Sequence, residues 1–210
     1  MTASPDKLER NLRLYPWCIA AFQAYCWLPV FFLFFSEKLP IERVLLLEAV
    51  YFGAICLLEV PSGYFADRVG RRTTLVISAV AIVAAHSMFF FGSFLDEVFL
   101  PYCAGQAALA LGLAFRNGTE TAFHFDTLHS LGRSEEYASR EAQSSRAGFL
   151  ANAGAALAGG AAASFELRYA YLLSLLAALV LAYLVQGYAD HIDHHIPFAS
   201  GKRENLGKPM

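Results

Sequence analysis

The sequence predicts an all-α membrane protein, built as a bundle of six transmembrane helices. Three observations lead to this fold class: an apolar composition, six long apolar runs, and positive charges gathered between alternate runs. Of the 210 residues, 57% are hydrophobic and 16% are charged, and mean hydropathy is +0.43. A soluble domain contains roughly a quarter charged residues. The composition therefore excludes an ordinary water-soluble globule.

Each apolar run has about the length that a helix needs to cross a bilayer. Roughly 20 residues, rising about 1.5 Å each, cover a hydrocarbon core of ~30 Å. Charged residues mark the boundaries, and the spans are expected at about 16–35, 44–66, 73–93, 98–120, 143–165 and 169–188. Residues 1–14 are expected to form a cytoplasmic segment, 15–188 the transmembrane domain, and 189–210 a polar cytoplasmic tail. The first run continues into further spans without a cleavage site, which excludes a cleavable signal peptide.

The distribution of Lys and Arg predicts the orientation. The termini and the loops on their side hold twelve of these residues, and the opposite loops hold Lys38, Arg43 and Arg168. By the positive-inside rule, both termini lie in the cytoplasm, and the chain is a multi-pass protein of the cytoplasmic membrane. A net charge of −2 gives no indication of a nucleic-acid partner. The four cysteines fall within predicted spans, where they are expected to act as packing residues.

The most informative segment joins the second and third spans. Glu59, Gly63 and Asp67 are spaced i, i+4, i+8, so they lie on one helical face. Gly63 on that face is expected to permit close approach of another helix. Gly70 is suited to a tight turn. Positive charge at the anionic membrane surface is supplied by Arg68, Arg71 and Arg72.

This segment resembles the hallmark loop of the major facilitator superfamily of secondary transporters, Gly-x-x-x-Asp-Arg-x-Gly-Arg-Arg. The matching residues are Gly63, Asp67, Arg68, Gly70, Arg71 and Arg72. An element similar to one that follows the fourth span in a bacterial branch of the superfamily runs from Gly118 through Glu120 to Asp126 and Leu128. The resemblance covers residues 11–188, the six-helix N-terminal half of the superfamily fold.

The resemblance implies a secondary active transporter that moves a small solute by alternating access, with a binding site near the membrane midplane and no cofactor. It also implies that Asp67, Arg68 and Arg72 act in gating, in a charge network that breaks when the protein opens inward. Superfamily members have about twelve spans. A homodimer or a separate second half is therefore expected to complete the transporter. The alternative is a truncated, non-transporting six-helix protein with a scaffold or regulatory role.

Two features separate this chain from other functional classes. The fifth span carries Gly154 to Gly160 without the proline of the antiporter motif, so that motif does not support drug/proton antiport. The sequence contains no catalytic triad, P-loop or Cys-x-x-Cys motif, which argues against an enzyme.

Ionisable residues at membrane depth are candidates for a proton or charge network. The candidates are Glu59, Arg116, Glu120 and Asp126. Arg116, Glu120 and His124 share a face if the fourth helix continues past residue 115, and both a structural network and a proton or substrate route stay open for them. Glu59 is either functional or a structural partner for Arg116 or a loop arginine.

The remaining polar residues receive more modest interpretations. Gln23 in the first span is a candidate for lining the central cavity, and Pro29 in the same run frees a backbone carbonyl. Glu48 is either a snorkelling surface residue or a functional one, and His86 is expected to be a packing residue. Asp190 to His195 is expected to be a polar tail rather than a metal site, and no metal is expected elsewhere.

Overall fold

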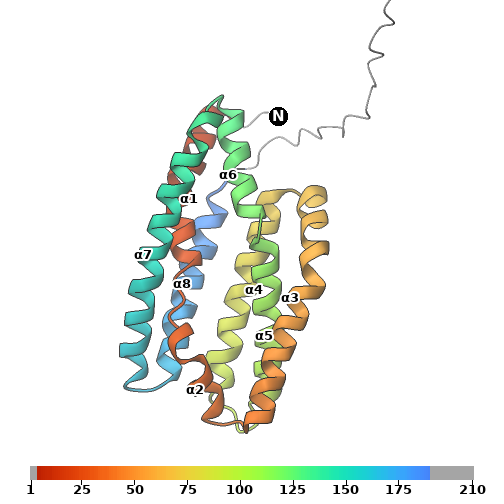
Figure 1. Cartoon of the computed structure of the whole chain (residues 1–210), viewed down its shortest axis with the longest axis vertical. Coiled ribbons are helices and arrows are strands. Elements are labelled where there is room, and N and C mark those ends of the chain that lie inside the picture. The colour runs from red at the N-terminus through yellow and green to blue at the C-terminus, as the bar shows by residue number, and fades with distance from the viewer. Residues whose placement is uncertain (1–3, 190–210) are drawn as a thin grey trace, which may run out of the picture.

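The computed structural model describes residues 4–189, which are almost entirely helical and contain no strand. The helices that it places are α1 (Pro5–Phe22), η1 (Leu28–Val30), α2 (Phe31–Ser36), α3 (Ile41–Val69), α4 (Arg71–Gly92), α5 (Phe99–Arg116), α6 (Thr119–Ser130), η2 (Ser134–Glu136), α7 (Tyr137–Ala163) and α8 (Arg168–Gln186). The long helices run roughly side by side in one bundle (Figure 1). The all-α class predicted from the sequence is confirmed.

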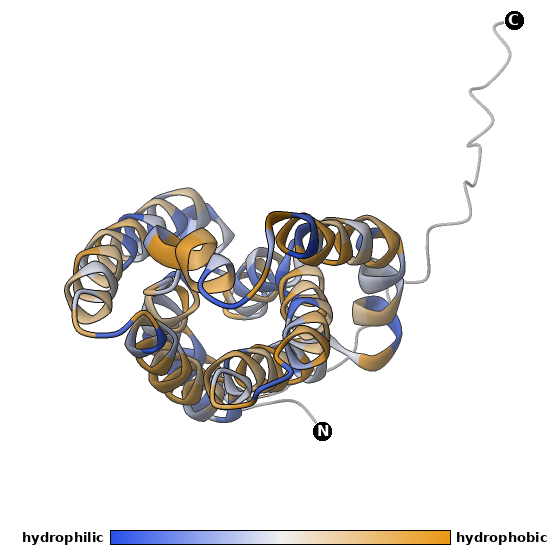
Figure 2. Cartoon of the chain, turned by 90° about the horizontal axis from the view of Figure 1, so that it is seen from below, coloured by the Kyte–Doolittle hydropathy of each residue, from blue (hydrophilic) through white to orange (hydrophobic). Residues whose placement is uncertain are grey.

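Three of the described helices are long and apolar enough to cross a membrane: α3, α4 and α8. The protein is therefore assigned to the membrane-associated class. Helix α5 includes Gln106 and Arg116, and α7 begins with polar residues and continues in Ala and Gly. Viewed along the bundle, apolar colours cover the outside of the helices as well as their inner sides (Figure 2).

Helix α4 lies at the centre of the bundle, and α3 lies at its edge. Half of the most apolar stretch of α4 is buried, against 11% of the corresponding stretch of α3. Helix α4 packs closely on α5, because Gly112 has no side chain where Ile82 and the carbonyl of Ser78 approach. The Ser78 hydroxyl donates a hydrogen bond of 2.6 Å to the Gly112 carbonyl. Helix α8 packs on the other side of α4, and α1 packs on α7 and α8.

The first apolar run differs from the predicted continuous span 16–35. Helix α1 ends at Phe22, and the chain crosses a non-helical segment before η1 and α2. Pro29 has no N–H and its ring clashes with the carbonyl four residues earlier, which disfavours a continuous helix. Neighbouring helices satisfy the exposed backbone groups. Asn152 donates to the Gln23 carbonyl at 3.0 Å, and the Trp27 N–H donates to the Ser174 hydroxyl at 3.1 Å.

The predicted span 98–120 also ends early, at Arg116. Gly118 adopts φ +76°, a backbone conformation that glycine reaches at little cost, and the chain resumes as the separate helix α6. Helix α6 lies with the first turns of α1 and α7 at one end of the bundle, beyond the α3–α4 turn (Figure 1). The polar stretch after Gly118 therefore forms a helix of its own.

The two ends of the described chain meet at this same end of the bundle. The Asn11 side chain donates to the Ala189 carbonyl at 3.0 Å and accepts from the Ala189 N–H at 2.8 Å. The opposite end is held by an aromatic cluster in which Phe34 of α2 contacts Tyr171 of α8, with ring centroids 4.0 Å apart. The cluster also includes Phe35, Phe89 and Tyr102.

Candidate functional site

The α3–α4 turn is made by a single residue. Gly70 adopts φ +96° and ψ 143°, so α4 begins immediately after α3 ends. The Gly70 N–H donates to the Ala66 carbonyl at 3.1 Å, and the Thr74 hydroxyl donates to the Gly70 carbonyl at 3.0 Å. A side chain at this φ would be strained, which explains the glycine.

Two arginines after this turn connect α4 to other helices. Arg71 forms an ion pair of 2.6 Å with Asp126 of α6. Arg72 donates from Nε to the Tyr188 carbonyl at 2.7 Å and from Nη2 to the Gln186 carbonyl at 3.4 Å. Since helix C-termini carry partial negative charge, the Arg72 guanidinium stabilises the end of α8. The two motif segments, more than fifty residues apart in sequence, are therefore in direct contact.

The α3 residues of the motif face outward instead. Asp67 and Glu59 are exposed, and their carboxylates form no hydrogen bond or ion pair with another described residue. The Arg68 guanidinium lies over the Tyr64 ring of the same helix, 5.0 Å from its centroid. No atom lies within 4 Å of a Cβ built on Gly63, so the close helix approach expected there does not occur within residues 4–189.

Arg116 and Glu120 form an ion pair inside the bundle, across the bend at Gly118. Arg116 Nε lies 2.6 Å from Glu120 Oε2, and both side chains are largely buried. Arg116 also donates to the Tyr25 hydroxyl at 3.0 Å and lies over the Phe22 ring, 4.7 Å from its centroid. Helix α1 therefore covers the pair, and Tyr25, in the non-helical segment, contributes to it.

A second interior contact brings α6, α7 and α1 together. His124 Nδ1 lies 2.7 Å from Glu141 Oε2, and the His124 side chain is 2% exposed. The Tyr15 hydroxyl donates to the same carboxylate at 3.1 and 3.3 Å, and the Tyr15 ring stacks on His124 with centroids 4.0 Å apart. Sequence reasoning missed Tyr15 and Glu141. The first turns of α7 are mostly polar, so the sequence gives no signal that the Glu141 carboxylate contacts other helices.

The four candidates for the charge network are thus distributed over three places. Arg116 and Glu120 pair with each other, Asp126 pairs with Arg71, and Glu59 lies on the outer face of α3. Glu59 therefore contacts neither Arg116 nor a loop arginine. Glu48 accepts a hydrogen bond of 3.0 Å from Gln106 of α5, which accounts for this partly buried carboxylate.

Gln23, the candidate for lining a central cavity, lies against α7. Its side chain occupies the space beside Gly148, and it does not line the interior pocket between α1, α4, α5 and α8. The polar residues lining that pocket are Tyr25, His86 and Ser174. His86 Nδ1 lies 2.9 Å from the Ile82 carbonyl, and its Nε2 is buried without a partner among the described residues.

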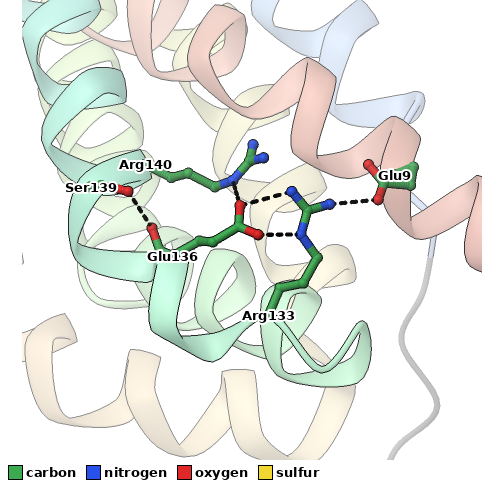
Figure 3. Close-up of polar contacts among 5 residues, drawn as sticks. All are labelled: Glu9, Arg133, Glu136, Ser139 and Arg140. Atoms are coloured by element: carbon green, nitrogen blue, oxygen red, sulfur yellow. Dashed lines mark hydrogen bonds and ion pairs between the residues drawn. The ribbon is translucent and has the colours of Figure 1, made fainter.

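A partly buried charge cluster joins α1 to the α6–α7 connection (Figure 3). Arg133 binds Glu136 through Nε at 2.6 Å and Nη2 at 2.7 Å, and binds Glu9 of α1 at 2.6 Å. Arg140 binds the same Glu136 carboxylate at 2.7 Å. Hydrogen bonds from Arg133 and Arg140 lower the pKa of Glu136 to about 2. The hydrogen bonds from Arg133 to Glu136 likewise raise the pKa of the Arg133 guanidinium.

Within residues 4–189, no group of three or more His, Cys, Asp or Glu side chains could hold a metal ion. The segment Asp190 to His195 and the predicted tail from residue 190 onward lie outside the described residues. No protein-family model, curated protein sequence or solved structure matches the chain.

Proposed function

We propose that this chain is a secondary active transporter of the major facilitator superfamily type, which moves a small solute by alternating access. The observation that carries the proposal is the Arg71–Asp126 ion pair, because it joins the two sequence segments that resemble the superfamily. The Arg72 contacts with the end of α8 add a third helix to the same junction. The proposal does not call for a cofactor or enzymatic chemistry.

In this proposal the chain crosses the cytoplasmic membrane six times. The broken segment α1–α2 makes the first pass, and α3, α4, α5, α7 and α8 make the other five. Helix α6 then lies at the cytoplasmic end, where Arg68, Arg71 and Arg72 face anionic lipid headgroups. An even number of passes places both termini on the same side, in agreement with the contact between Asn11 and Ala189. In the proposal that side is the cytoplasm, because it holds most of the Lys and Arg residues.

The cytoplasmic contacts act as a gate. Arg71 and Arg72 hold α4 to α6 and to the end of α8, and these contacts break when this end of the bundle opens. Ion pairs that form in only one of two packed arrangements bias the equilibrium between them. The partly exposed Arg71–Asp126 pair contributes at most about 1 kcal/mol to this bias, and the Arg72 contacts add to it. Arg71 and Asp126 are therefore gating residues and not solute ligands.

The outer face of α3 supports a partner in the membrane. Glu59 has no described partner, and a carboxylate that faces hydrocarbon is costly. Asp67, in the last turn of α3, also has no described partner. Gly154 and Gly160 of α7 also have open space beside them, so α7 presents a smooth surface for a helix. We propose a second copy of this chain, in parallel orientation, as the partner that supplies the other six helices.

Reconstitution into liposomes tests the function. With an imposed pH gradient and radiolabelled sugars, amino acids and organic cations as probes, a transporter accumulates at least one probe class. Glu120→Gln, in the largely buried pair, is expected to reduce that uptake at least about tenfold, and Asp126→Asn, in the partly exposed pair, by up to about fivefold, whereas the exposed Glu135→Gln leaves it unchanged. Uptake that survives both substitutions contradicts the site assignment.

The alternative, a six-helix protein with a scaffold or regulatory role, predicts a different result. Folded, correctly inserted protein would then move none of the probes under any gradient. Its distinguishing property would be stable association with another membrane protein, recovered after mild crosslinking.

A further inference from the structure

His124 is enclosed by three helices at the end of the bundle where the motif segments meet. It lies on α6, its ring stacks on Tyr15 of α1, and its Nδ1 contacts the Glu141 carboxylate of α7. The Tyr137 ring is also close, with centroids 5.6 Å apart. Because the histidine is 2% exposed, a proton that binds there contacts the protein rather than bulk water.

The ionisable groups around this histidine come from every helix packed on it. Glu120 precedes it by one turn on α6, and Arg116 lies at the end of α5. Tyr15 faces both Glu120 and Glu141, and Tyr188, just after α8, faces Tyr15 and Glu120. Arg116 and Glu120 pair with each other, and the Glu141 side chain, which is 23% exposed, forms no ion pair with a described Lys or Arg, so its charge is uncompensated while His124 is neutral. One proton on His124 balances it.

We propose that His124 and Glu141 form a binding site for a single proton, and that this proton stabilises the packing of α6 against α7 and α1. The protonated imidazole donates to Glu141 as one half of an ion pair, and the Tyr15 hydroxyl supplies the second hydrogen bond to that carboxylate. A partly buried carboxylate without an opposite charge is destabilising, and Glu141 is only 23% exposed. Proton uptake therefore favours the closed arrangement, and separation of α6 from α7 releases the proton.

The role of the His124–Glu141 pair in coupling proton movement to solute transport rests on the proposed transport function. Proton release when the α6 end opens links inward opening to delivery of a proton on that side of the membrane. His124 lies one turn after Glu120 and two residues before Asp126, all on α6. Proton binding and the opening of the gate therefore act on the same helix. Proton binding itself, however, is measurable without any solute.

The direct test is a histidine titration of the full chain in mild detergent, with carbon-13 at Cε1 of its six histidines. His124→Gln identifies the His124 signal. Glu141→Gln is expected to lower the proton affinity of His124 at least about tenfold, because the opposite charge within hydrogen-bond distance is removed. Glu135→Gln, an equal change of charge on an exposed side chain, leaves the titration in place. An unchanged titration in Glu141→Gln, or an equal change in the control, overturns the proposal.

A second experiment separates this site from the transport function. In liposomes, the counterflow exchange of a transported solute without a pH gradient is expected to persist in Glu141→Gln, while proton-driven accumulation is lost. Accumulation that remains in Glu141→Gln, together with an unchanged titration, removes the proton site and leaves the transporter. A changed titration without transport of any probe supports the proton site and contradicts the transport function.

Discussion

At the residue scale, Gly159 determines how closely α7 approaches the non-helical segment after α1. A Cβ at this position would collide with the carbonyl of Cys26, a backbone group that cannot rotate away. A Cβ on Gly160, the next residue, would have no atom within 4 Å. Adjacent glycines in one helix thus have opposite tolerance for a side chain.

We expect Gly159→Ala to destabilise the protein by at least about 2 kcal/mol, because the segment and α7 must separate to accommodate the methyl group. Gly160→Ala should be neutral or stabilising by up to about 1 kcal/mol, since alanine favours a helix interior over glycine. Thermal unfolding in detergent measures both. Equal melting temperatures for the two variants would contradict the packing described for Gly159.

A residue-scale prediction also follows from Glu136, whose pKa is lowered to about 2 by Arg133 and Arg140. A carboxylate with a lowered pKa stabilises the fold at pH values above its unfolded pKa of about 4.3, and that contribution is lost as the pH falls toward 2. Glu136→Gln should lower the melting temperature at pH 6, and the difference from wild type should disappear near pH 2. A difference that persists at pH 2 would assign the effect to something other than charge.

At the element scale, the sequence predicts the helices better than it predicts the contacts between them. The positive charge and Gly70 could be assigned to the α3–α4 turn because a short motif fixes their spacing. The contact of Arg71 with Asp126 was not predicted, because the two residues lie in separate sequence segments. The C-terminal end of α1 could not be predicted in the same way. Pro29 indicates a bend, but the break after Phe22 also depends on Gly159, Asn152 and Ser174 in other helices. Glu141 was missed for the same reason, since its partners are Tyr15 and His124.

The Arg71–Asp126 pair allows a prediction for the contact between α4 and α6. Both side chains are about one-third exposed, so solvent screens their attraction. A double-mutant cycle of Arg71→Gln and Asp126→Asn should give a coupling free energy of at most about 1 kcal/mol. Thermal unfolding at low and high salt measures it. A coupling well above this, unaffected by salt, would make the pair a structural element and not a gate that opens and closes.

At the scale of the whole molecule, the proposed dimer predicts a contact between two exposed and oppositely charged residues. Asp67 lies near the end of α3, and Arg146 of α7 is exposed and forms no ion pair with another residue among those described. Helix α7 begins beyond the α3–α4 turn (Figure 1). Arg146 lies in the half of α7 nearer that start, and Asp67 lies in the last turn of α3. In a parallel dimer, the α3 of one copy can then pack on the α7 of the other with these charges opposed.

Asp67→Arg and Arg146→Asp should each weaken this dimer, because each places like charges opposite one another, and the double variant should restore it. A change of about tenfold or more in the dimer dissociation constant is expected for each single variant, measured by fluorescence energy transfer between labelled chains in vesicles. Arg13→Asp, on the exposed face of α1, serves as the control for a lost positive charge and should leave the dimer unchanged. The double variant can restore the dimer only if the two residues face each other across the interface. If both single variants weaken the dimer and the double variant does not restore it, the α3 face packs against lipid or against a different protein.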